Sequence, residues 1–224
     1  MSELPGYIST WWAAVVHPES AVRVVLRPEK GERFTRFLVV AIAGLYAVYG
    51  VTMGVFRGVE SGVFSGLKLP FLYLATLLVC FPAFYVLNCL YAQRLSAMQC
   101  LRMLVLAVST NAVAVASFAP ISLFFTLTTS RAGYTFLVLL QVAVFAVSAL
   151  LSVVVIGMIF RATAASLGRR LRPGLVVTWA ALYAFVLSQM SWVLRPWIGT
   201  WTLDYAPFRP IGGSFIEAIL KLLG

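Results

Sequence analysis

Polar and cationic side chains come together near the end of the last apolar run of the sequence. Ser188, Ser191 and Arg195 recur at spacings of three and four, so on a helix they share one face. Three tryptophans lie close to the arginine: Trp192, Trp197 and Trp201. Because tryptophan marks the ends of membrane helices, we expect Arg195 to extend to lipid phosphates there or to pair with Asp204. The alternative is a specific site for an anion, a lipid or a protein partner.

Six neutral polar residues lie inside apolar runs and form a candidate polar core of a helical bundle. They are Asn88, Ser109, Thr110, Asn111, Gln141 and Gln189. In a membrane such side chains usually form hydrogen bonds between helices, each contributing about 0.6 to 2 kcal/mol. The stretch 109–111 leaves a second interpretation open, in which it lines a polar cavity.

Ionisable residues of the kinds that catalysis and metal binding use are placed outside the apolar runs. The carboxylates are Glu3, Glu19, Glu29, Glu32, Glu60, Asp204 and Glu217, and His17 is the one histidine. Proton relays, metal sites and activated nucleophiles all need such groups close together at depth. We therefore expect no catalytic residues, no metal, no cofactor and no enzyme activity.

The composition excludes a water-soluble domain. The chain is 62% hydrophobic and 11% charged, whereas a soluble domain carries about 25% charged residues. Its net charge of +10 does not indicate nucleic acid, because the basic residues stand beside apolar runs, where lipid phosphates can meet them. No polar segment is long enough to form a domain that presents a basic face to nucleic acid.

Five apolar runs must position these side chains. They are Phe37–Phe56, Leu69–Ala92, Leu101–Leu127, Tyr134–Phe160 and Leu175–Leu194. Each can cross a hydrocarbon core of about 30 Å as a helix, and irregular backbone cannot face lipid. The sequence therefore predicts an all-α, polytopic membrane helical bundle, in which Pro82 and Pro120 should kink their helices.

The two ends of the chain predict amphipathic helices that lie in the membrane interface. Residues 1–35 form an interfacial segment with Trp11 and Trp12, residues 36–195 the five-helix domain, and residues 196–224 a second interfacial segment. Most of the 17 Lys and Arg residues fall in the N-terminal segment and in the second and fourth connections. The positive-inside rule then places the N-terminus in the cytoplasm and the C-terminus outside.

The centre of the chain resembles the Yip family of five-span membrane proteins, particularly its bacterial branch. The resemblance rests on FPAFYVLN in the second run, on Ser96 and Gln99 in a short polar loop, and on a third run that ends near a proline. The glycine pair often found in that loop is replaced by YAQR. Membership would imply a non-enzymatic five-helix protein, here of a bacterial inner membrane.

Two functions are compatible with the sequence. The first is a structural or accessory subunit, or scaffold, that binds membrane lipids and other membrane proteins or further copies of itself. The second is a small transporter or channel for a neutral or anionic solute, which would use the polar residues 109–111 and Arg195. The scarcity of charge within the apolar runs favours the first.

Overall fold

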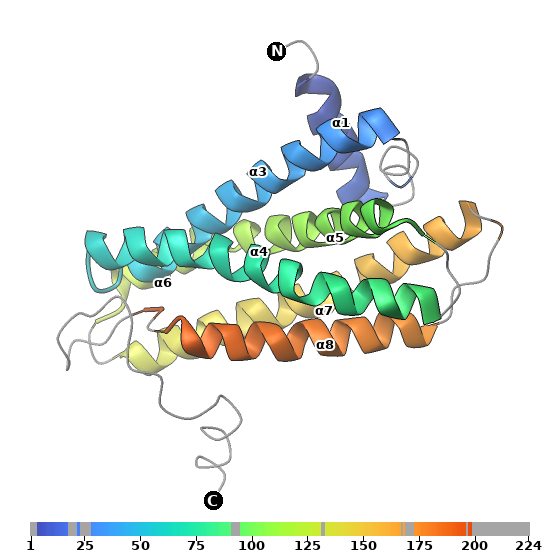
Figure 1. The fold of residues 1–224 in the computed structure, drawn as a ribbon. Coiled ribbons are helices and arrows are strands. Elements are labelled where there is room, and N and C mark those ends of the chain that lie inside the picture. The colour runs from blue at the N-terminus through green and yellow to red at the C-terminus, as the bar shows by residue number, and fades with distance from the viewer. Residues whose placement is uncertain are drawn as a thin grey trace, which may run out of the picture.

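The computed structural model describes residues 4–17, 22, 28–90, 95–130, 133–166, 168, 173–195 and 197–198. These residues form helices and no strand: α1 (Leu4–Val16), α3 (Pro28–Gly54), α4 (Val59–Leu90), α5 (Ala97–Ser117), α6 (Ala119–Thr128), α7 (Tyr134–Ser166) and α8 (Pro173–Val193) (Figure 1). Five segments are long and apolar enough to cross a membrane: Gly31–Gly54, Val59–Leu90, Ala97–Thr128, Tyr134–Ser166 and Val176–Val193. The predicted all-helical fold with five such helices is confirmed.

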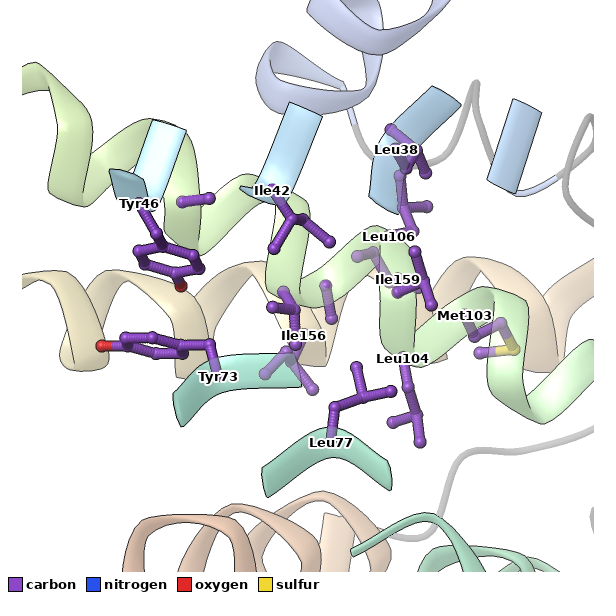
Figure 2. Close-up of a cluster of buried hydrophobic side chains, with 14 of the residues drawn as sticks. Leu38, Ile42, Tyr46, Tyr73, Leu77, Met103, Leu104, Leu106, Ile156 and Ile159 are labelled. Carbon is purple, nitrogen blue, oxygen red and sulfur yellow. The ribbon is translucent and has the colours of Figure 1, made fainter. Parts of the chain in front are cut away.

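Helix α3 carries one face of the core. Its buried side chains follow each other at spacings of three and four: Phe34, Leu38, Ile42, Tyr46, Tyr49 and Met53. This spacing aligns them along one side of the helix, which packs against α4, α5 and α6. Figure 2 shows Leu38 and Ile42 pointing toward Leu106 of α5, and Tyr46 stacked on Tyr73 of α4.

Helix α5 lies at the centre of the bundle. Every residue from Arg102 to Thr110 is buried, as expected for a helix that is surrounded on all sides. A capping box fixes its start, because the Gln99 backbone N–H donates to the Ser96 hydroxyl at 3.2 Å and the Ser96 N–H donates to the Gln99 side chain at 3.0 Å. The third span thus begins at a defined residue.

The third span is broken near its proline. α5 ends at Ser117, Phe118 caps it, and α6 starts with Pro120 in its first turn. A proline is tolerated there because the first N–H groups of a helix have no partner inside it. The predicted kink is therefore a change of helix, whereas α4 stays helical through Pro70 and Pro82.

The second span begins ten residues before the predicted Leu69, and the prediction of its start was wrong. Residues 59–68 are rich in glycine and serine, which lowers their hydropathy, but these small residues let α3 and α4 approach closely. A Cβ atom at Gly54 would lie 2.5 Å from the Ser61 carbonyl oxygen, and one at Gly50 would lie 2.9 Å from the Gly66 Cα. Small residues four apart on both helices allow this contact in membrane bundles.

The earlier start also corrects the expectation that ionisable residues such as carboxylates and lysine lie outside the membrane-spanning helices. Lys68 lies within the second span and is 6% exposed. Glu32 and Glu60 also fall within the candidate spans, each at the second residue. A buried lysine at this depth is uncommon in membrane helices, so the charge distribution of α4 differs from the one the sequence predicted.

The contact between α3 and α4 predicts that Gly50→Ala destabilises the protein by about 1 to 3 kcal/mol, because overpacking a tight contact costs that much. The matched control is Gly44→Ala on the same helix, where a Cβ would meet nothing within 4 Å. Thermal unfolding in a mild detergent, followed by circular dichroism, measures the difference. Equal unfolding temperatures for the two variants would contradict the close approach.

Candidate functional site

A cavity of about 680 Å³ lies among α4, α5, α7 and α8. Its apolar walls include Leu69, Leu72, Val108, Phe145, Ile156 and Trp179. Figure 1 shows α8 alongside α4, with α7 behind these two helices. Val142 and Val153 of α7 and Ala184 of α8 line the cavity and are exposed. The cavity therefore opens between α7 and α8, toward the surroundings of the bundle.

The polar part of the cavity lining lies toward the end of α8. Ser188, Ser191 and Arg195 all line the cavity, as their spacing predicts for one helical face. Among the described lining residues, Arg195 is the one that carries a charge. We call this part of the cavity the Arg195 end; the start of α7, with Tyr134, lies there as well.

Asn111 lines the cavity, and its carboxamide forms hydrogen bonds to two other helices. The Tyr46 hydroxyl of α3 donates to the Asn111 Oδ1. The Asn111 Nδ2 donates to the Ser148 carbonyl oxygen at 3.1 Å and to the Ser152 hydroxyl, both on α7. This residue therefore joins α3, α5 and α7 in the middle of the bundle.

Gln141 makes a second connection of the same kind, nearer the Arg195 end. The Tyr49 hydroxyl donates to the Gln141 Oε1, and the Gln141 Nε2 donates to the Ser122 hydroxyl at 2.9 Å. Thr52 stands beside this group, with its hydroxyl 3.5 Å from that of Ser122. Gln141 thus joins α7 to α3 and α6.

Ser109 and Thr110 belong to helix packing and do not line the cavity. Their hydroxyls donate to the carbonyl oxygens of Leu106 and Ala107, at 2.7 and 2.8 Å. Ser109 also accepts a hydrogen bond from the Trp11 indole of α1 at 3.3 Å. Of the polar stretch 109–111, Ser109 therefore contacts α1, Thr110 is bonded within α5, and Asn111 lies in the cavity wall.

The tyrosine partners of the two amides were not recognised in the sequence. Tyr46 and Tyr49 lie inside the first apolar run and are buried. A tyrosine inside an apolar run is a signal, because its buried hydroxyl needs a hydrogen-bond partner. The glycine pairs of α3 and α4 were missed as well, although the spacing of Gly50 from Gly54 and of Gly62 from Gly66 matches a known helix-pairing motif.

Arg195 is held against an aromatic ring at the end of α8. Its guanidinium carbon lies 3.7 Å from the centre of the Trp192 ring, a distance that permits a cation–π interaction. The Trp197 indole donates to the Ser191 carbonyl oxygen at 3.0 Å, and the Trp197 carbonyl accepts from the Ser65 hydroxyl of α4 at 2.6 Å. The segment after α8 is thereby attached to α4.

The other predicted residues lie elsewhere. Asn88 is fully buried near the opposite end of α4, where its Nδ2 donates to the Leu95 carbonyl at 3.2 Å. Gln189 is half-buried on α8 and is not part of the cavity lining. Trp201, Asp204 and the predicted C-terminal amphipathic helix lie outside the described residues. The proposed pairing of Arg195 with Asp204 stays a prediction.

Comparisons with protein-family models, with curated proteins and with solved structures find no match to this chain. The resemblance to the Yip family therefore stays a prediction.

The hydrogen bonds of Gln141 predict that Gln141→Leu lowers the free energy of unfolding by about 1 to 3 kcal/mol, because it leaves the buried Tyr49 and Ser122 hydroxyls without this partner. Gln189→Leu is the matched control and should change stability by no more than about 0.5 kcal/mol. Thermal unfolding of both variants in one detergent measures the effect. If Gln141→Leu lowered the free energy of unfolding by no more than the control does, the stabilising role of the Gln141 hydrogen bonds would be contradicted.

Proposed function

We propose that this protein is a non-enzymatic integral membrane protein, an accessory subunit or scaffold that binds other membrane proteins and lipids. The observation that carries the proposal is that Ser109 and Asn111 make hydrogen bonds to other helices of the bundle. Side chains used in this way hold helices together. A transport path would instead need polar groups that face water.

The exposed apolar surface supports the same proposal. Ile8, Trp12 and Val16 of α1 are exposed and follow each other at a spacing of four. They form one apolar face of the helix, next to the face of Tyr7 and Trp11, whose rings contact α3. Such a face suits a helix that rests on lipid or on a partner.

For the membrane and the orientation of the chain, we propose the arrangement that the distribution of basic residues favours. The N-terminus lies in the cytoplasm and the C-terminus outside a bacterial inner membrane, with the basic residues of the N-terminal segment beside anionic lipid phosphates. In this orientation the Arg195 end of the cavity faces the exterior side.

The proposal predicts discrete protein contacts on the outer surface of the bundle. A photo-crosslinking residue at Leu150 of α7 or at Leu78 of α4, both more than two-thirds exposed, should give protein adducts of defined mass in the native membrane. The same residue at Ile42, which is fully buried, is the control and should give no intermolecular adduct. Mass spectrometry of the isolated adducts identifies each partner as another protein or a second copy.

Native mass spectrometry after gentle solubilisation provides the second readout, and the expected result is an oligomer or a complex. A monomer in every detergent, together with no protein adduct from either exposed position, would leave the proposal without support. Flux of a neutral or anionic solute through liposomes that hold the pure protein would support the transporter alternative instead.

A further inference from the structure

The cavity is elongated along the direction of the helices. On α8 its lining runs from Trp179 to Trp192, which is about 20 Å at a rise of 1.5 Å per residue. One leaflet provides about 15 Å of hydrocarbon, half of a core of about 30 Å. The cavity is therefore long enough for a full acyl chain, and its opening between α7 and α8 faces the hydrocarbon of the bilayer.

The deep part of the cavity offers an acyl chain a dry surface. The carboxamides of Asn111 and Gln141 form its most polar wall, but both oxygens accept hydrogen bonds from tyrosines and both nitrogens donate to serines. Both amides are therefore bonded to protein groups, and among the described lining residues the Trp179 indole N–H is the buried polar group without a hydrogen-bond partner. A cavity whose lining is almost entirely apolar or already hydrogen-bonded favours apolar ligands over water.

The Arg195 end differs from this deep part. Arg195, Ser188 and Ser191 line it together, so a cation and two hydroxyl groups stand where α8 reaches the membrane interface. The flanking Trp192 and Trp197 are typical of the head-group level. A phosphate at this end would meet a guanidinium, which binds phosphate through paired hydrogen bonds.

We propose that the cavity binds one anionic phospholipid, with an acyl chain between α7 and α8 and its phosphate at Arg195. The chain enters sideways from the bilayer through the opening beside Val142, Val153 and Ala184. The site rests on the lipid-binding part of the proposed function and names its ligand, but it requires no protein partner. Loss of partner binding and loss of lipid binding are therefore separate results.

Native mass spectrometry tests the site. The protein is reconstituted in nanodiscs with equal amounts of phosphatidylglycerol and phosphatidylcholine, released, and its retained lipid identified. The unmodified chain should retain one phosphatidylglycerol. Ala180→Phe fills the cavity from α8 and should lower retention about tenfold, the equivalent of about 1.4 kcal/mol. Ala181→Phe is the matched control, because Ala181 is exposed and does not line the cavity.

A separate variant tests the contact between Arg195 and the lipid phosphate. Arg195→Gln should retain lipid but bind phosphatidylglycerol and phosphatidylcholine equally. Equal retention by Ala180→Phe and Ala181→Phe would overturn the cavity as the binding site. An unchanged preference for phosphatidylglycerol in Arg195→Gln would overturn the role of the arginine.

A titration keeps the proposal testable if Ala180→Phe fails to fold. Trp179 lines the cavity and is 1% exposed, so it is shielded from bulk lipid. Phosphatidylglycerol with bromine on its acyl chain, added to delipidated protein in detergent, should quench the Trp179 fluorescence, taken as the difference from Trp179→Phe, with saturation at one lipid per chain. Quenching that rises in proportion to lipid without saturation would contradict a single site.

Discussion

Two tyrosine hydroxyls on α3 hold the carboxamides of Asn111 and Gln141, and the arrangement of the bundle depends on these hydrogen bonds. Within lipid, a polar side chain without a partner is costly, so each amide must find its partners inside the protein. Asn111 and Gln141 satisfy their second polar group on α7 and α6. The position of α7 relative to α3 and α5 follows from this requirement.

On the other side of the bundle, α3 and α4 are held together by the close packing of small residues. Gly50 and Gly54 of α3 meet Ser61 and Ser65 of α4 at backbone distance, and α8 then packs along α4. One pair of helices is therefore fixed by small residues, and α7 is fixed by amides. The cavity lies where these two parts of the bundle meet, and in its deep wall the same amides that position α7 are hydrogen-bonded to protein groups.

The sequence predicts the five spanning helices well, because long apolar runs have few other stable structures in lipid. It also identifies Asn111 and Gln141 as bundle residues, since neutral polar groups at depth need partners. It fails at the start of α4, where hydropathy treats glycine and serine as weakly apolar although they permit the closest helix contact. Lys68 was placed outside the span for that reason. The cavity is not predictable from one sequence, because it arises from helices whose relative positions depend on contacts between distant residues.

The proposed lipid site depends most on a deep cavity wall that is free of water. Nuclear magnetic resonance of the isotope-labelled protein in micelles can detect transfer of magnetisation from water to the side-chain amide protons of Asn111 and Gln141. We expect no transfer from water and slow exchange of these protons, because both amides are hydrogen-bonded to protein groups. Strong transfer from water to both amides would show that the cavity is hydrated and would contradict a dry site for an acyl chain.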